Sequence, residues 1–203
     1  LDNTSSQDVT NYVVNNSAGS PLTAIQDVVN PSLVHLIFGT SLTNGVHYML
    51  TANGVKDLAG NAINNGTSNF SFYTPQQYDV VIDEIMPDPS PQVGLPNAEW
   101  IELKNTSSFP INLAGWKLSD VTGQSGAMPN FILEPDSFVI VCTGSAVPLL
   151  SLFGSVISVT NFPLLDNDGD LISLSDPSGK SIHAVQYSSP WYQNKLKKDG
   201  GGT

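Results

Sequence analysis

Carboxylate side chains are concentrated in one stretch of the chain, Val80–Asn105, and they are the first candidates for chemistry. A pair of carboxylates can act as the acid and base of a glycosidase, and a group of them can bind a hard cation. Either site requires side chains that converge on one point, so the strands that carry them decide the question. The acids of the stretch are Asp83, Glu84, Asp88, Glu99 and Glu102.

These acids fall on two predicted strands and on the proline-rich loop between them. VVIDEIM and AEWIELKN both alternate apolar and polar residues, as a strand with one buried face does. Strict alternation in VVIDEIM places Glu84 on the face of Ile82 and Met86, and Asp83 on the opposite face. In AEWIELKN it places Glu102 away from the core. We therefore expect the acids to be spread over both faces and a loop, which disfavours a preassembled acid pair.

A second acidic segment, LDNDGD, is the best candidate for a metal site. Asp166, Asp168 and Asp170 alternate around a turn, and their hard oxygen ligands suit calcium. The competing interpretation is a hairpin turn, stabilised by Asp and Asn side chains, in which Gly169 takes an unusual backbone angle. No glutamate follows at the offset that an EF-hand requires, so calcium is a secondary hypothesis and no other cofactor is expected. A cation held by the first acidic stretch and its loop carbonyls is a further alternative.

The cysteine and the histidines offer little other chemistry. Cys142 lies in the apolar run SFVIVCTG, where we expect a buried, unreactive thiol. His35 and His47 lie on neighbouring predicted strands with no evident third ligand, which disfavours zinc. His183, in SIHAVQ, has the pattern of an exposed strand residue. No G-x-S-x-G, H-E-x-x-H or P-loop motif occurs, and the sequence predicts no enzyme.

Charge and composition exclude other classes of function. The 203 residues include 18 acidic and 7 basic residues, none of them arginine, for a formal net charge of −11. Such a chain lacks the basic face that nucleic acids and anionic membranes require, so we expect neither as a partner. No apolar run has transmembrane length, which predicts no membrane insertion. The Asn-, Ser- and Thr-rich composition is typical of secreted or surface proteins, and the start at LDNTSS suggests a piece of a longer protein.

The elements that must position these residues are almost all strands. Helical periodicity is nearly absent, and Pro148 limits the one candidate turn at Ser145–Gly154. Apolar or alternating runs recur instead, bounded by Gly, Asn, Asp and Pro, which predicts an all-β chain of two tandem immunoglobulin-like β-sandwiches. A short hinge at Tyr73–Asp79 separates domains at residues 1–75 and 76–203. The predicted strands are NYVVN, LVHLIF, VHYMLTA and NFSFYT, then VVIDEIM, EWIELKN, WKLSD, FVIVCTG, VISVT, DLISLSD and IHAVQYS.

The first domain reads as a hairpin, LVHLIF to VHYMLTA, followed by a turn in DLAGN. In that turn Asp57 can accept backbone N–H groups and Gly60 can take a positive φ. The order of a strand, L-x-x-G-x-x-Y-x-L, a loop and D-x-A-G-N resembles the bacterial Ig-like domains of surface-layer and cell-wall proteins. The resemblance covers about half of such a domain. It implies that the sandwich of residues 1–75 is incomplete at its N-terminus and has an open sheet edge.

The second domain resembles the lamin tail domain from residue 79 to about residue 200. The matching segments are V-I-x-E-I-M-x-D-P, E-W-I-E-L-x-N, I-N-L-x-G-W-x-L-x-D and LDNDGDLISLSDPSG. This resemblance implies an immunoglobulin-like fold of the kind found at the end of nuclear lamins and in secreted bacterial multidomain proteins. Bacterial members commonly have Asn at the position of Asp83, so this chain adds a carboxylate there. Related domains have uncharged residues in the LDNDGD turn, which favours the turn interpretation.

These observations predict a non-catalytic structural, adhesion or targeting segment of a larger bacterial secreted or cell-surface protein. The expected location is extracellular or at the cell surface, with an unidentified protein or glycan as partner. One alternative is a calcium-dependent adhesive module. Another is a polysaccharide-binding accessory domain of an extracellular hydrolase, in which Trp191 and Tyr192 of SSPWYQ stack on sugar rings.

Overall fold

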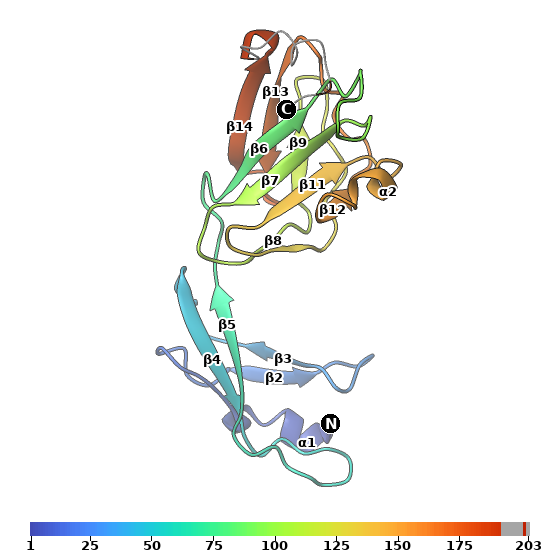
Figure 1. Ribbon diagram of the computed structural model, residues 1–203. Helices are drawn as coiled ribbons and strands as arrows, with labels where there is room; N and C mark the ends of the chain where they lie inside the picture. Colours follow the sequence, from blue (N-terminus) through green and yellow to red (C-terminus); the bar gives the residue numbers. More distant parts are fainter. Residues whose placement is uncertain (192–200, 202–203) are drawn as a thin grey trace. The chain divides into compact units, whose positions relative to one another are not determined.

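The computed structural model describes residues 1–191 and Gly201. The chain divides into two compact units, Leu1–Thr74 and Pro75–Thr203, called unit 1 and unit 2 below. Both are built from short strands joined by turns and loops (Figure 1). The prediction of an all-β chain is confirmed.

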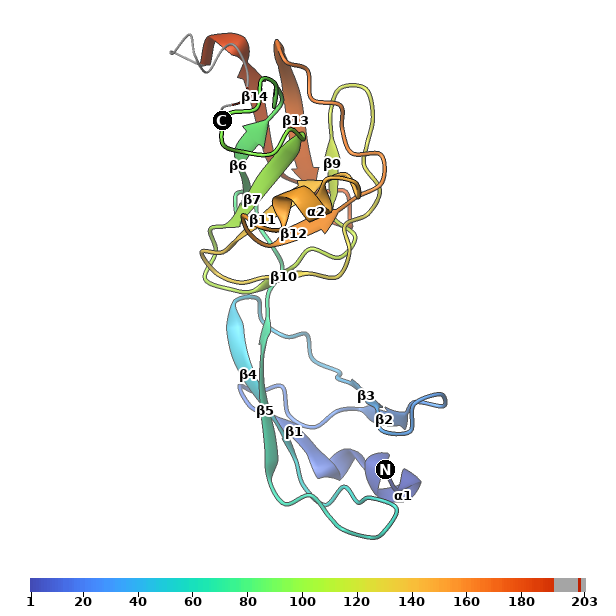
Figure 2. The same cartoon turned by 45° about the vertical axis from the view of Figure 1, so that its right-hand side comes forward.

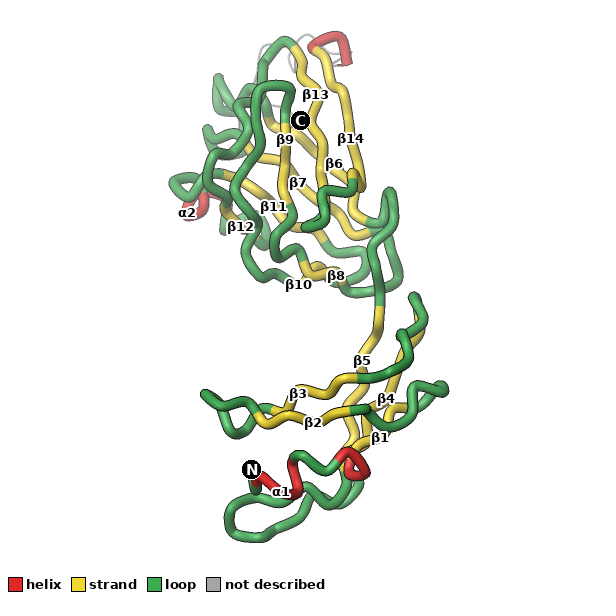
Figure 3. Tube along the Cα trace, turned by 180° about the vertical axis from the view of Figure 1, so that it is seen from behind, coloured by secondary structure: helices red, strands yellow, loops and turns green. Residues whose placement is uncertain are grey.

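Unit 1 contains two small antiparallel sheets, one with strand order β1-β4-β5 and the other a β2-β3 pair (Figure 3). Tyr12, Ala24 and Val55 form a buried cluster, and Val14 and Tyr48 are also buried, but the other apolar side chains packed against the cluster are only partly buried. Its elements are α1 (Asn3–Ser6), the 3-10 helix η1 (Val9–Asn11), β1 (Tyr12–Val14), β2 (Thr23–Gln26), β3 (Val34–Ile37), β4 (Val46–Ala52) and β5 (Gly66–Phe72).

The predicted pairing of the runs LVHLIF and VHYMLTA is wrong. β3 pairs with β2, whereas β4 pairs with β1 and β5, so the two runs belong to different sheets. The partner of β3 gives a weak signal in the sequence, because Ala24 is its one buried side chain. The DLAGN turn is confirmed. Asp57 Oδ1 accepts the N–H groups of Ala59 and Asn61, each at 2.9 Å, and Gly60 has a φ of +89°.

Unit 2 is a β-sandwich of a four-stranded sheet, β12-β11-β7-β6, and a three-stranded sheet, β14-β13-β9. Ile101 and Leu103 are fully buried in its core, as the alternation of their strand predicts, and the buried Trp116 lies just before β9. Its elements are β6 (Val80–Met86), β7 (Trp100–Asn105), β8 (Ile111–Asn112), β9 (Lys117–Ser119), β10 (Ile132–Leu133), β11 (Phe138–Cys142), α2 (Val147–Leu150), β12 (Val156–Ser158), β13 (Gly169–Ser175), β14 (Ser181–Ser188) and the 3-10 helix η2 (Ser189–Trp191).

The two sheets of unit 2 meet where β14 lies beside β6 (Figure 1). The N–H of Tyr78 donates to the carbonyl oxygen of Ile182 at 2.9 Å, and the N–H of Ile82 donates to Nδ1 of His183 at 3.0 Å. The expectation that His183 is exposed is wrong. Its ring is half-buried because it fills this seam, edge-on to the ring of Tyr78 with centroids 5.7 Å apart.

A second apolar cluster lies around α2, which packs against β11 and β12 (Figure 2). Trp100, Cys142 and Leu150 are buried in it. Pro148 lies in the first turn of α2, as the predicted short helical turn requires. Cys142 is buried, as predicted, and burial raises the pKa of its thiol to about 11. None of the helices in the described residues has the length and apolar character needed to cross a membrane.

One buried polar side chain joins the end of β7 to its surroundings. The Asn105 side-chain amide donates through Nδ2 to the carbonyl oxygens of Phe109 and Leu133, each at 2.8 Å. Its Oδ1 accepts the N–H of Ser107 at 2.9 Å and the hydroxyl of the same residue at 2.8 Å. All the polar atoms of this side chain are therefore satisfied, as burial demands.

Candidate functional site

A β-bulge at Asp83 determines where the acids of β6 point. Ile82 pairs with Leu103 and Glu84 pairs with Glu102, so Asp83 is the extra residue between them. The extra residue places Glu84 on the opposite face of the sheet from the buried Ile82. The prediction that Glu84 and Ile82 share a face is therefore wrong, because strict alternation does not continue through a bulge.

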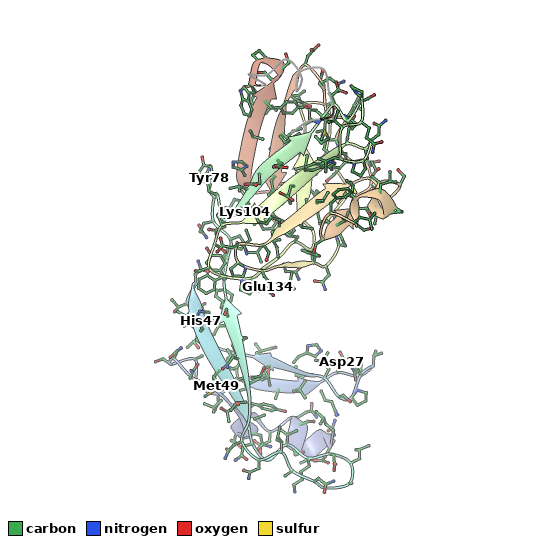
Figure 4. All side chains as sticks on the ribbon, in the orientation of Figure 1. Asp27, His47, Met49, Tyr78, Lys104 and Glu134 are labelled. Carbon is green, nitrogen blue, oxygen red and sulfur yellow. The ribbon has the colours of Figure 1, made fainter. Side chains whose placement is uncertain are left out.

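The register brings Glu84 directly opposite Glu102 on the outer face of the sheet. Residues opposed in this way have Cβ atoms about 4.5–5.5 Å apart. Burial raises the pKa of Glu102, and the negative charges of Glu84 and Asp83 raise it further. Three acids are thus grouped on β6 and β7, where the sequence predicted dispersal. Lys104, labelled in Figure 4, places its Nζ 4.9 Å from the ring centroid of Phe138.

A separate acidic pocket of about 600 Å³ lies among the loops of unit 2. The LDNDGD segment forms one wall, the residues after β9 form another, and Glu99 reaches in from the start of β7. Two exposed apolar side chains, Val121 and Leu164, also line the pocket. The pocket is therefore acidic with apolar edges. The carboxylates that line it belong to Glu99, Asp120, Asp166 and Asp170.

The LDNDGD segment itself has the bonding of a turn. Asp166 Oδ1 accepts the N–H of Asp168 at 3.1 Å, and the carbonyl oxygen of Asp166 accepts the hydroxyl of Tyr187 at 2.8 Å. Gly169 has a φ of +139°, as the turn interpretation requires. Within residues 1–191 and Gly201, no three His, Cys, Asp or Glu side chains are grouped to hold a metal ion. Calcium at Asp166, Asp168 and Asp170 stays a prediction.

Two acids of the pocket come from outside the LDNDGD segment. Glu99 Oε2 accepts the N–H of Leu165 at 3.4 Å. Burial raises the pKa of Glu99, and the nearby Asp88 charge adds to this effect. Asp120 Oδ1 accepts the N–H of Thr122 at 2.6 Å. Sequence analysis missed this convergence because no local spacing relates Glu99 or Asp120 to LDNDGD.

The histidines of unit 1 lie on different sheets. His35 Nε2, on β3, lies 2.9 Å from Asp27 Oδ2. His47 Nδ1, on β4, lies 2.7 Å from Ser71 Oγ. The β2-β3 turn brings Asp27 beside His35, a neighbour that was not evident in the sequence. Figure 4 labels Asp27 and His47 on these separate elements.

The proposed sugar-stacking aromatics lie at the end of β14. Trp191, in η2, is 60 % exposed. Tyr192 lies outside the described residues. Sugar stacking by this pair stays a prediction.

A family model for the lamin tail domain matches residues 73–189, more than half of the 203-residue chain. The chain belongs to the lamin tail domain family. The match begins just before β6 and ends at the first residue of η2, so it covers both sheets of the unit 2 sandwich. The predicted resemblance of unit 2 is confirmed, whereas the resemblance of residues 1–75 to surface-layer Ig-like domains stays a prediction.

Among solved structures, a DUF4876 family protein from Bacteroides thetaiotaomicron is similar at 11 % identity with a TM-score of 0.34. The match covers 70 % of this chain and 58 % of that protein, so the chain spans less than two thirds of its length. A likeness this distant carries no functional argument. No curated protein matches the chain.

Proposed function

We propose that the chain is a non-catalytic segment of a bacterial secreted or cell-surface protein, which spaces neighbouring domains and presents surfaces for adhesion or targeting. The observation that carries this proposal is the lamin tail match over the whole unit 2 sandwich, because this Ig-like family is non-enzymatic. The partner would be a protein or a glycan outside the cell.

The arrangement of the acids on β6 and β7 supports the same proposal. Two glycosidase carboxylates act from opposite sides of a bound sugar. Glu84 and Glu102 instead lie side by side on one sheet face, with Asp83 at the adjacent bulge. Like charges opposed in this way repel each other, and no pocket is described between these two side chains.

The non-catalytic part of the proposal is tested with purified protein and a panel of glycoside, ester and peptide substrates. We expect the wild-type chain to hydrolyse these substrates no faster than the Glu84→Ala/Glu102→Ala variant or buffer alone does. Reproducible turnover that the double variant abolishes would refute the proposal. The adhesive part is tested on glycan arrays and immobilised extracellular proteins. If the chain binds neither the glycans nor the proteins, adhesion is refuted and a spacing role remains.

A calcium-dependent adhesive role is the second candidate. The observation that favours it is the pocket that places Glu99 and Asp120 beside Asp166 and Asp170. An ion that binds only the folded state raises the melting temperature. The site would be established if the melting temperature is higher in calcium than in chelator and if Asp166→Asn/Asp170→Asn removes this difference. An unchanged midpoint refutes it and is the result expected for a purely structural segment.

A further inference from the structure

Strand β5 forms one edge of the β1-β4-β5 sheet and has β4 as its one hydrogen-bonded neighbour (Figure 1). Sheet edges expose unpaired N–H and C=O groups, and proteins protect them with short strands, charged side chains, prolines or bulges. β5 has none of these protections. Its seven residues pair with β4 in unbroken register and include neither proline nor a charged side chain. The strand is therefore a template for pairing with a further strand.

The other sheet edges in residues 1–191 are short or covered. β1, β9 and β12 have three residues each, β2 and β3 have four, and β8 and β10 have two. The longer strands β6 and β14 lie beside each other at the seam of unit 2. Within these residues, β5 alone combines length with an open side, and its middle residues 67–70 are all exposed.

The hydrogen bonds between β1 and β4 determine which way the backbone groups of β4 point. The N–H of Asn15 donates to the carbonyl oxygen of Met49 at 3.2 Å, and the N–H of Asn53 donates to the carbonyl oxygen of Asn11 at 2.9 Å. Met49 and Asn53 thus direct their backbone groups to β1. Successive strand residues direct these groups to opposite sides, so Leu50 directs its groups to β5.

The register carries this alternation across to β5. Leu50 pairs with Ser68, so Ser68 directs its N–H and C=O back to β4. Thr67, Asn69 and Ser71 alternate with the residues that bond to β4, and they direct their backbone groups to the open side. Within residues 1–191 and Gly201, these groups have no hydrogen-bond partner. The open edge of β5 is defined below as the backbone of Thr67, Asn69 and Ser71.

We propose that two copies of this chain pair through their open edges, antiparallel and centred on Asn69, so that the two three-stranded sheets join into one. In this register Thr67 of one copy lies opposite Ser71 of the other, and Asn69 lies opposite Asn69. Opposed residues that both face the partner exchange two hydrogen bonds, which gives about six in all. A two-fold axis at Asn69 generates the pairing, so both copies use the same surface.

The side chains of β5 complement a second copy of the same strand. On one face the register sets Thr67 beside Ser71, and hydrogen bonds between such hydroxyl side chains stabilise a sheet. On the other face it sets Phe72 of each copy over Gly66 of the other, so that an aromatic ring covers the backbone that glycine leaves bare. Phe72 is 37 % exposed in the single chain, so the pairing also covers apolar surface.

The absence of charge around β5 also favours a second copy as the partner. A net charge of −11 makes most approaches between two copies repulsive. No Asp, Glu, Lys, Arg or His occurs between Asp57 and Asp79, a stretch that contains the whole of β5. The paired strands are therefore neutral. The association goes beyond the proposed function, which needs no dimer, so either can fail without the other.

Sedimentation equilibrium of the whole chain, from micromolar to millimolar concentration, tests the proposal. We expect a monomer–dimer equilibrium. Thr67→Lys/Ser71→Lys sets lysine opposite lysine at both ends of the pairing, and should weaken the dimer by about tenfold or more, because like charges directly opposite each other destabilise a sheet. This loss is expected even though two added lysines reduce the overall negative charge of the chain.

Thr67→Lys/Ser71→Glu is the matched control, because the same two positions then set lysine opposite glutamate across the axis. This variant should associate at least as tightly as the wild-type chain. Mixing Thr67→Lys/Ser71→Lys with Thr67→Glu/Ser71→Glu should likewise restore association, as a heterodimer. Neither Thr67 nor Ser71 is buried, and an unaltered melting temperature verifies that each variant folds.

The proposal is overturned if the wild-type chain stays monomeric at millimolar concentration, which would leave the open edge to a strand of different sequence. It is also overturned if the lysine–lysine and lysine–glutamate variants associate equally, because the dimer would then form elsewhere on the chain. Growth beyond the dimer overturns the two-fold arrangement.

Discussion

Replacing Asn105 with alanine should destabilise unit 2 severely. The side chain is 0 % exposed and takes part in four hydrogen bonds, two to the carbonyl oxygens of Phe109 and Leu133 and two from Ser107. A hydrogen bond contributes about 1 kcal/mol net, so losing four costs about 4 kcal/mol, before any penalty for buried groups left without a partner. That is a large share of the roughly 5–15 kcal/mol that stabilises a domain.

Urea unfolding followed by tryptophan fluorescence measures this loss in unit 2 alone. Every tryptophan of the chain, Trp100, Trp116 and Trp191, belongs to unit 2. The free energy of unfolding should fall by about 4 kcal/mol at an unchanged m value.

Asn130→Ala is the control for this measurement. The exposed Asn130 accepts one hydrogen bond, from Asn112 at 2.8 Å. Its loss should change the free energy of unfolding by less than about 0.5 kcal/mol. If Asn105→Ala proves no more harmful than this control, the buried amide does not join the segments as described.

Two further perturbations act on the same unit. Gly169→Ala should lower the urea midpoint of unit 2 well below that of Gly179→Ala. A Cβ at Gly169 would lie 2.7 Å from the carbonyl oxygen of Tyr187, whereas a Cβ at Gly179 meets nothing within 4 Å. Equal midpoints for the two variants would contradict this reasoning. Burial lowers the pKa of His183 below 6.5 in the folded state, so the unfolded chain binds more protons there. Its contribution to stability is therefore fully present above pH 6.5 and is lost as the pH falls towards the folded pKa. His183→Gln keeps an acceptor for the N–H of Ile82 and should reduce the dependence of the urea midpoint on pH below pH 6.5. If the pH dependence does not change, the titrating group is not His183.

Strands with regular alternation could be predicted from the sequence. WIELKN shows why: Ile101 and Leu103 are buried, while Glu102 and Lys104 between them keep contact with solvent. The strands β8 and β10 could not be found in this way, because two residues are too few to show a period. The β2 strand was missed for a related reason, since its inward side chain is a single small alanine.

The site could be predicted much less well, because it depends on pairing between distant segments. A bulge is a property of two strands, so nothing within VVIDEIM alone indicates that Asp83 is the extra residue that turns Glu84 towards Glu102. The acidic pocket likewise forms only when Glu99 reaches the backbone of Leu165. Local turns such as DLAGN were predictable because their hydrogen bonds close within a few residues.

The seam between β6 and β14 gives unit 2 a mechanical property. The N–H of Tyr78 bonds to the carbonyl of Ile182, and Lys180 Nζ donates to the carbonyl of Pro75 at 3.0 Å, so the beginning of the unit is fastened to the start of β14. The arrows of the two strands run in roughly the same direction (Figure 1). Force applied to both ends of the unit would slide these strands past each other, loading the seam bonds together instead of peeling them one by one. We expect this geometry to resist tension, as the proposed spacing role would require.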